Sequence, residues 1–272
     1  MYQSMLSISK YTISIYALVV AHSAFAATKP YLYEMNGEKF EGILATPDAS
    51  YTQLKADKIP GILLVHNWMG VTNDTAEQAQ KLANLGFVVL AADIYGQGKR
   101  PNNAQEAGKF AGKYKGDRKL FRERLNLAYQ QLKKQENLNQ KLLFAAGYCF
   151  GGTGVLELAR SGAELSGVMS FHGGLDSPNI AEGKNIKARV IAFHGADDPY
   201  VSGKDLAAFE DEMRSAKVDW QLVKLGNAVH SFTDKSAGND NSKGAAYNET
   251  ADKRSWAQMR LFLQESGAKV NP

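Results

Sequence analysis

Residues 142–152 read Leu-Leu-Phe-Ala-Ala-Gly-Tyr-Cys-Phe-Gly-Gly, an apolar run that passes directly into a glycine-rich turn. The residues from Gly152 onward favour a helix, so the cysteine lies where a buried strand is expected to turn into a helix. Such a turn is too tight for side chains at Gly147 and Gly151, and it lets the following backbone N–H groups face a substrate oxygen. The pattern makes Cys149 a candidate nucleophile. As the only cysteine in the chain, it has no partner for an internal disulfide.

The segments on either side of this turn alternate between short apolar runs and helix-forming stretches. An opening antiparallel hairpin is expected at 31–45, because Asn36-Gly37 suits a two-residue turn. Buried apolar strands that alternate with helices are typical of a mostly parallel sheet covered on both faces. The sequence therefore predicts a doubly wound α/β fold. Strands are expected at 61–66, 87–92, 142–146, 167–171, 189–193 and 220–225, and helices at 74–85, 120–135, 204–215 and 250–264.

Two local expectations concern helix boundaries. Asp74, with Glu77 three residues later, has the spacing of a capping box and is expected to cap the helix at 74–85. The segment 97–117 is rich in Gly, Asn and Lys. We expect it to be a mobile excursion with one short helix.

Length and charge restrict the classes of protein to consider. The 272 residues suit one α/β domain, because a single core grows to about 250 residues before a chain divides. The net charge of +4 is spread along the chain and is not gathered in arms or stripes. This distribution argues against a nucleic-acid or membrane-surface partner.

The first 26 residues resemble a secretory signal peptide. Lys10 precedes the apolar segment Tyr11–Ala21, and Ala24-Phe25-Ala26 fits a cleavage site between small residues. We expect residues 1–26 to be removed, which leaves 27–272 as a single domain of a secreted or periplasmic protein without a membrane partner. An uncleaved N-terminal anchor is the alternative, although the apolar run is shorter than the roughly 20 residues of a spanning helix.

Nucleophilic catalysis needs a base within hydrogen-bond reach of the nucleophile and a group that orients the base. Asp198 follows the strand at 189–193, and His230 follows the strand at 220–225. This chain order of nucleophile, acid and histidine is the one found in α/β-hydrolases, whose loops meet at the carboxyl ends of the strands. Asp197 competes with Asp198 for the orienting role.

The motifs together resemble those of the dienelactone hydrolase family. The resemblance covers about residues 35 to 265 and depends on three segments: Gly-Tyr-Cys-Phe-Gly-Gly at 147–152, His-Gly-Ala-Asp-Asp-Pro-Tyr-Val at 194–201 and His-Ser-Phe at 230–232. It implies an α/β-hydrolase fold and the hydrolysis of a small-molecule ester or lactone by a Cys149-His230-Asp198 triad, without a cofactor. The oxyanion donors would be the backbone N–H of Phe150 and that of Asn67 or Trp68.

Three positions depart from the family's pattern. Asn67 stands where family members that act on dienelactone carry a glutamate that assists thiolate formation, and an amide cannot accept that proton. Gln97 and Asp234 stand where the family has two arginines that hold a substrate carboxylate, so preference should move toward neutral esters. Lys99 or Arg100 could compensate for these losses. The resemblance also makes Tyr95, Gln97 and Phe232 expected substrate contacts.

Other functions receive less support from the residues. Three histidines, His66, His172 and His194, sit at strand ends, but they lack the close ligand spacing of a metal site, so no metal is expected. The alternative from another class is a secreted, non-catalytic binding protein on a degenerate hydrolase scaffold. A thiol oxidoreductase is disfavoured because no second cysteine is present to resolve a mixed disulfide.

Overall fold

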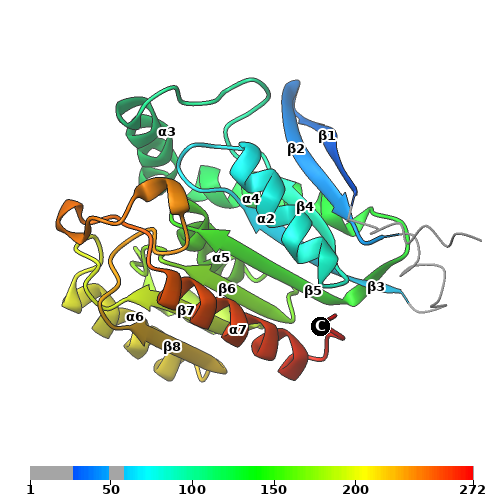
Figure 1. The fold of residues 1–272 in the computed structure, drawn as a ribbon. Coiled ribbons are helices and arrows are strands. Elements are labelled where there is room, and N and C mark those ends of the chain that lie inside the picture. Colours follow the sequence, from blue (N-terminus) through cyan, green and yellow to red (C-terminus); the bar gives the residue numbers. More distant parts are fainter. Residues whose placement is uncertain (1–26, 49–57, 272) are drawn as a thin grey trace, which may run out of the picture.

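One eight-stranded sheet connects all the strands of the computed structural model, which describes residues 27–48 and 58–271 (Figure 1). The strand order is β1-β2-β4-β3-β5-β6-β7-β8. The strands are β1 (Ala27–Met35), β2 (Glu38–Thr46), β3 (Ile59–Val65), β4 (Val88–Ala92), β5 (Leu138–Tyr148), β6 (Gly167–Phe171), β7 (Arg189–Gly195) and β8 (Trp220–Leu225). The predicted signal peptide at 1–26 lies outside the described residues, and N-terminal sequencing of the protein expressed from the full-length sequence would check it.

Helices occupy most of the connections between the parallel strands. The α-helices are α2 (Asn73–Asn84), α3 (Ala104–Gly116), α4 (Arg118–Lys133), α5 (Phe150–Arg160), α6 (Gly203–Ser215) and α7 (Glu249–Glu265). Short 3-10 helices lie at Ile180–Asn185, Lys235–Ala237 and Asn241–Lys243. In the described ranges, none of the helices is both long and apolar enough to cross a bilayer.

The sheet is parallel from β4 to β8 and antiparallel at its β1-β2 edge. Asn36 and Gly37 both have positive φ, 52° and 79°, which is the geometry of the tight hairpin turn that this dipeptide predicts. The mostly parallel, doubly wound sheet expected from the alternating apolar runs is confirmed.

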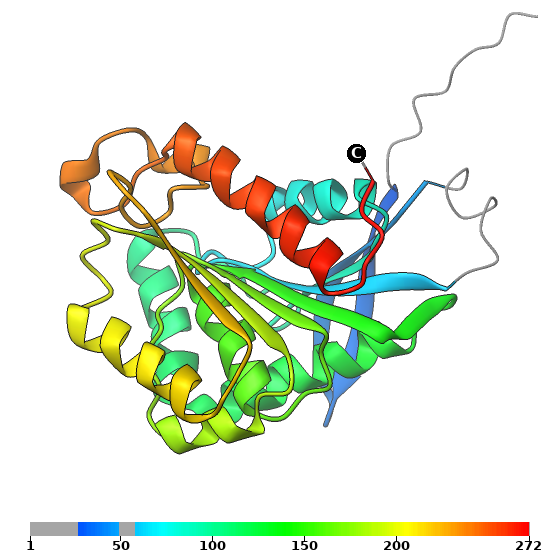
Figure 2. The same ribbon diagram turned by 90° about the horizontal axis from the view of Figure 1, so that it is seen from below.

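Two apolar cores lie on the two faces of the sheet. Figure 2 shows α2 and α7 on one face, and α3, α4, α5 and α6 on the other. The first core is built from the inner sides of α2 and α7, including Leu82 and Phe262. The larger core packs α4 and α5 against the sheet through residues such as Leu125 and Leu156. Burial on both faces explains why the central strands are apolar along their whole length.

The strand register brings the carboxyl ends of the strands to one edge. Because these ends coincide, the loops that leave β3, β5, β6, β7 and β8 meet above the same edge of the sheet. The pairs that define this edge are Val65 with Gly147, Tyr148 with Phe171, Phe171 with Phe193, and Gly195 with Leu225.

The structure corrects two of the local expectations. Helix α2 is capped by Thr72, not Asp74, because Thr72 has extended backbone and its N–H donates to Thr75 Oγ1 at 3.2 Å. Asp74 lies in the first turn instead. The segment 97–117 is mostly the 13-residue helix α3, because Asn103 caps it and the spacing of Ala107, Ala111 and Tyr114 gives it one buried stripe.

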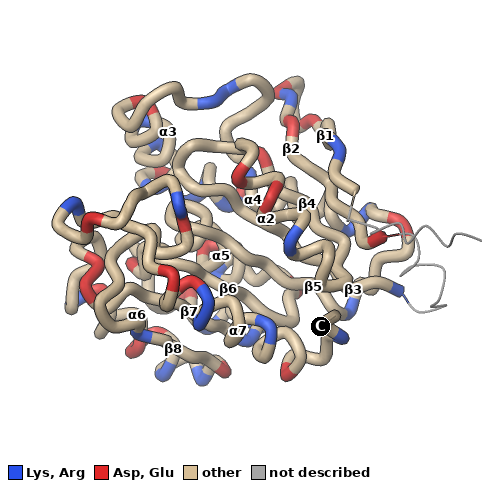
Figure 3. Tube along the Cα trace, in the orientation of Figure 1, with Lys and Arg blue, Asp and Glu red and all other residues tan. Residues whose placement is uncertain are grey.

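Basic and acidic residues are interspersed along the backbone trace in Figure 3. Both signs occur on the helices that cover the sheet, and they also occur on the loops at the carboxyl edge. The described residues therefore form no large region of a single charge sign along the trace in this view.

Candidate active site

The cysteine turn lies between β5 and α5, as its sequence predicts. Cys149 has φ 56° and ψ −114°, and its N–H donates to the Phe171 carbonyl at 3.0 Å. A Cβ atom at Gly147 would lie 2.1 Å from the Gly151 carbonyl oxygen, and one at Gly151 would lie 2.1 Å from the Val65 carbonyl oxygen. Side chains are therefore excluded at both glycines, and the strained backbone raises the sulfur at the carboxyl edge of the sheet.

A continuous chain of hydrogen bonds links Cys149, His230 and Asp198. The distance from His230 Nε2 to Cys149 Sγ is 3.0 Å, and that from His230 Nδ1 to Asp198 Oδ2 is 2.8 Å. Asp198 is buried and its other oxygen accepts the N–H of Tyr200 at 2.8 Å, whereas Asp197 is exposed. Of the two neighbouring aspartates, Asp198 is therefore the one that contacts the imidazole.

The loop that carries His230 is held by its own backbone. The His230 N–H donates to the Gly244 carbonyl at 3.2 Å, and the His230 carbonyl accepts the Ala246 N–H at 3.0 Å. Ser231, the next residue, has a φ of 59°. These constraints fix the direction of the imidazole toward the cysteine turn.

The pKa values of the sulfur and the imidazole shift in opposite directions. Burial raises the pKa of the Cys149 thiol, but hydrogen bonds from His230 and from the Phe150 N–H outweigh burial and lower that pKa below its ordinary value. Burial lowers the pKa of His230, yet its hydrogen bonds to Asp198 and Cys149 raise the pKa to about 10. The two shifts belong to one coupled pair and favour a thiolate beside an imidazolium near neutral pH.

The loop after β3 faces the cysteine. Asn67 and Trp68 line the same cavity as Cys149, and the Asn67 Oδ1 atom accepts the Met69 N–H at 2.9 Å. The Trp68 carbonyl accepts the Tyr95 hydroxyl at 2.9 Å, which ties this loop to the sheet. The three expected oxyanion donors, from this loop and from Phe150, thus belong to segments that border the sulfur.

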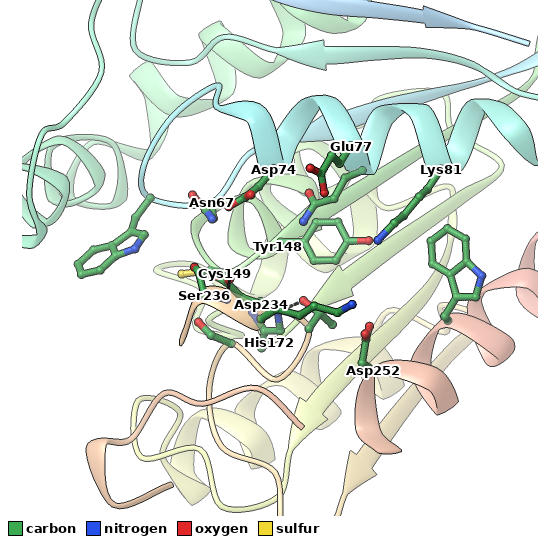
Figure 4. Close-up of a pocket in the computed structure, with 16 residues that line it drawn as sticks. Asn67, Asp74, Glu77, Lys81, Tyr148, Cys149, His172, Asp234, Ser236 and Asp252 are labelled. Atoms are coloured by element: carbon green, nitrogen blue, oxygen red, sulfur yellow. Dashed lines mark hydrogen bonds between the residues drawn. The ribbon is translucent and has the colours of Figure 1, made fainter. Parts of the chain in front are cut away.

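Two cavities open onto Cys149. The narrow cavity has a volume of about 170 Å³ and is shown in Figure 4. The wide cavity has a volume of about 390 Å³. Trp68, Cys149 and Ser231 border both, so the sulfur lies where they meet. The narrow cavity is further lined by Asn67, Asp74, Glu77, Gln78, Lys81, Tyr148, His172, Thr233, Asp234, Lys235, Ser236, Asp252 and Trp256. The wide one is further lined by Ala111, Lys115, Phe150, Thr153, Gly174, Tyr200, Val201, His230 and Ala245.

The three expected substrate contacts do not line either cavity. Tyr95 is almost fully buried, and its hydroxyl donates to the Trp68 carbonyl, so it holds the loop after β3 in place. Gln97 is exposed, and its side chain donates to Glu41 at 3.2 Å. Phe232 is fully buried in the core between the sheet and α7. We therefore correct these expectations. Tyr95 and Phe232 are buried packing residues next to the site, and Gln97 lies on the surface near β2.

The two cations that could compensate for the missing arginines are engaged elsewhere. Lys99 forms an ion pair with Glu38 at 2.8 Å. Arg100 lies 3.4 Å from Asp93 and donates to the Val71 carbonyl at 2.8 Å. Neither lines a cavity at Cys149.

Lys115 and His172 line the cavities but are absent from the set of expected site residues. Lys115 follows Ala111 by one helical turn on α3, and both border the wide cavity. This spacing would have located Lys115 if 97–117 had been interpreted as a long helix. His172 follows β6, and its strand-end position was the available signal.

The strand-end histidines do not form a metal centre in the described residues, where no group of three or more His, Cys, Asp or Glu could hold an ion. His66 is fully buried, its Nε2 accepts the Ile94 N–H at 3.3 Å, and burial lowers its pKa to about 4. It is therefore a neutral structural residue beneath the loop that carries Asn67.

The model of the dienelactone hydrolase family matches residues 40–267. The chain belongs to this family. The match includes the cysteine turn and the segments that carry Asp198 and His230. Membership makes the protein a dienelactone hydrolase-like hydrolase of a small-molecule substrate, and its sheet and helices form the α/β-hydrolase fold.

Individual relatives of this dienelactone hydrolase-family chain cover between 53% and 91% of its length. A probable 2-oxo-3-(5-oxofuran-2-ylidene)propanoate lactonase of Bradyrhizobium sp is 25% identical, over 84% of this chain and 90% of that protein. An uncharacterized protein of Caenorhabditis elegans is 34% identical, over 53% of this chain and 93% of that protein. The crystal structure of a dienelactone hydrolase-like promiscuous phosphotriesterase from metagenomic libraries superposes with a TM-score of 0.83 at 36% identity, over 91% of this chain and 100% of that one.

Proposed function

We propose that the protein hydrolyses carboxylic esters or lactones through an acyl-cysteine intermediate on Cys149. The observation that carries the proposal is the hydrogen-bonded chain from Sγ to the Asp198 carboxylate, with distances of 3.0 Å and 2.8 Å. A nucleophile, a base and an orienting acid in this order are the arrangement that acyl transfer needs. Membership in a hydrolase family supports the same conclusion.

Acylation would begin with the thiolate already formed. The sulfur attacks the acyl carbon, and the carbonyl oxygen becomes an oxyanion that backbone N–H groups of Phe150 and of Asn67 or Trp68 stabilise. The carbon–oxygen bond of the ester then breaks. The His230 imidazolium donates its proton to the departing alkoxide, so the alcohol leaves neutral and the acyl group remains on sulfur.

Deacylation requires His230 in its neutral form. Once the sulfur is acylated, the hydrogen bond and the charge of the thiolate no longer raise the pKa of His230, and only Asp198 still does so. The imidazole, which has given its proton to the leaving alcohol, therefore stays neutral and activates a water molecule by accepting a proton from it. The water attacks the thioester, the carbon–sulfur bond breaks, and the acid is released with the thiolate restored.

The substrate class is inferred from relatives and from the cavities together. One relative is named as a probable lactonase, and another, from Saccharolobus solfataricus, as a putative carboxymethylenebutenolidase, which points to lactones and esters. Asp234 lines the narrow cavity where the family pattern has an arginine. We therefore propose that the substrate does not need a carboxylate on this side of the sulfur.

Phosphotriester hydrolysis is a second candidate activity. It is favoured by the similarity to the phosphotriesterase structure, at 36% identity over the whole of that chain. The same thiolate could attack phosphorus, with an aryloxide as the leaving group. The non-catalytic binding protein is less favoured, because binding alone does not require the chain of hydrogen bonds at Cys149.

Kinetics with short p-nitrophenyl esters and a p-nitrophenyl phosphotriester would test the proposal. We expect the wild type to cleave the esters, and Cys149→Ala and His230→Ala to lower kcat/KM by at least about a thousandfold. Acid quench and peptide mass analysis should find the acyl group on Cys149. Equal ester turnover in the three proteins would refute the mechanism, and turnover of the phosphotriester alone would favour the second activity.

A further inference from the structure

The narrow cavity that opens onto Cys149 is lined by more carboxylates than lysines. Asp74 and Glu77 lie on α2, and Asp234 lies in the loop after His230. Burial raises the pKa of Asp74, and the charges of Asp234 and Glu77 raise it further. No cation contributes to this shift. Asp74 is thus close enough to both Asp234 and Glu77 for their negative charges to disfavour its ionised form.

The two lysines that line this cavity lie near a fourth carboxylate, Asp252. Burial raises the pKa of Asp252, and Lys81 and Lys235 act against that rise, which places both lysines near Asp252. Figure 4 shows Asp74 beside Asn67, whereas Lys81 and Asp252 lie beyond Tyr148. A substrate group held next to the sulfur therefore meets carboxylates before it meets lysines.

A buried nitrogen without a partner borders the same cavity. His172 is only 2% exposed, and its Nε2 atom lies 2.8 Å from Thr233 Oγ1. Its Nδ1 atom is buried and has no hydrogen-bond partner among the described residues. Burial holds the pKa of His172 well below its ordinary value, so the ring is neutral. In the tautomer whose Nε2–H donates to Thr233 Oγ1, the neutral Nδ1 atom is an acceptor that an N–H donor of a ligand would satisfy.

The wide cavity has the opposite character. Lys115 is the one Lys, Arg, Asp or Glu that lines it in the described part of the chain. Its charge also acts on Cys149 and lowers the pKa of the thiol. A cationic substrate group is therefore repelled from the wide cavity and attracted to the narrow one.

We propose that the narrow cavity binds a protonated amine, and that the protein acts on esters or lactones that carry an ammonium group a few bonds from the scissile carbonyl. The ammonium would lie against Asp74 and Asp234, with His172 Nδ1 as a further acceptor for its N–H. The apolar part of the substrate would occupy the wide cavity. This inference rests on the proposed hydrolysis at Cys149.

Two acetate esters of nearly the same shape test the proposal. Dimethylaminoethyl acetate carries a protonated amine near neutral pH, and isoamyl acetate has a carbon atom in its place. Hydrolysis is followed by titration of the released acid, with the uncatalysed rate subtracted. We expect the wild type to favour the ammonium ester by at least about fivefold in kcat/KM.

Charge-removing variants locate the preference. Asp74→Asn and Asp234→Asn should each lower the ratio of the two kcat/KM values by about threefold. Asp234→Asn keeps an oxygen that can accept the Ser236 N–H, as Asp234 does at 2.8 Å. Asp211→Asn is the matched control, because Asp211 pairs with Arg214 on the surface of α6 and does not line either cavity. It should leave the ratio unchanged.

The outcomes separate this inference from the proposed function. A wild-type ratio of one or less, or a ratio that neither cavity variant changes, overturns the ammonium site. If the wild type cleaves isoamyl acetate through Cys149 without a charge preference, only this inference fails. If neither acetate nor any p-nitrophenyl ester is cleaved, both fail.

Discussion

Cys149 is held in a backbone conformation that a residue with a side chain rarely adopts, with φ 56° and ψ −114°. Such a conformation costs of order 1–3 kcal/mol and persists only where the surroundings impose it. Here the hydrogen bond to Phe171 and the close approach of Gly151 to the Val65 carbonyl impose it. The strain is the structural cost of raising the sulfur toward His230.

At the residue scale, the two neighbouring aspartates give a sharp test. Asp198→Asn keeps the shape of the side chain but removes the charge that stabilises the His230 imidazolium. We expect kcat/KM for a p-nitrophenyl ester to fall by about a hundredfold to ten-thousandfold. Asp197→Asn is the control, because Asp197 is exposed, and it should keep nearly full activity. Equal losses in the two variants would contradict the assignment.

Residues of the candidate site were predictable where their position depends on the backbone alone. Cys149, Asp198 and His230 lie within five residues of the ends of β5, β7 and β8. Parallel pairing of these strands brings the three residues to one edge of the sheet, and this does not depend on the neighbouring side chains. Tyr95 and Phe232 lie next to the same edge, but their side chains turn into the core. Direction depends on packing partners from elsewhere in the chain, which no local pattern contains.

At the element scale, the junction of β5 and α5 depends on the two glycines of the turn. A methyl group at Gly151 would lie 2.1 Å from the Val65 carbonyl oxygen and 2.6 Å from that of His66. Neither backbone atom can move without disturbing β3. The turn therefore constrains the sequence more strongly than does the rest of α5.

This constraint predicts the effect of Gly151→Ala on stability. We expect the free energy of unfolding to fall by at least about 2 kcal/mol, because the sheet must shift to admit the methyl group. Gly108→Ala is the matched control within α3, where an added Cβ atom meets nothing within 4 Å. It should stabilise the protein by about 0.5–1 kcal/mol. Urea unfolding of both variants measures this, and similar midpoints would refute the steric argument.

Helices and strands were predictable from the sequence where the local pattern of apolar residues alone determines them. The strands β6 and β8 begin and end at the residues predicted for them, 167–171 and 220–225. Helix α3 was underestimated because its glycines and lysines suggest a loop, whereas Ala107, Ala111 and Tyr114 bury one stripe of it. Tertiary burial outweighed composition there, and with the helix came Lys115, which borders the wide cavity.

At the scale of the whole molecule, a buried ionic network anchors the far end of the nucleophile helix. Arg160, near the end of α5, is fully buried and pairs with Glu157 at 2.9 Å and with Glu212 at 2.7 Å. Glu212 belongs to α6, which lies on the same face of the sheet. Removal of one partner from such a network is costly, so α5 and the turn before it are firmly placed.

Only the complete fold brings the sulfur and the imidazole together, since Cys149 and His230 are 81 residues apart in the chain. Their shifted pKa values are consequences of that contact. The thiolate–imidazolium pair persists above the lowered pKa of Cys149 and below the pKa of His230, about 10. The charged pair should therefore be present across the neutral range and should be lost when the chain unfolds.

The most direct measurement of this central claim is the rate of Cys149 alkylation by iodoacetamide as a function of pH. In the folded wild type, we predict a rate that reaches its plateau well below the ordinary thiol pKa of about 8.5. His230→Gln should move the midpoint upward, because only the Phe150 N–H and the charge of Lys115 then act against the burial of the thiol. A wild-type midpoint at or above about 8.5 that His230→Gln leaves unchanged would contradict the account.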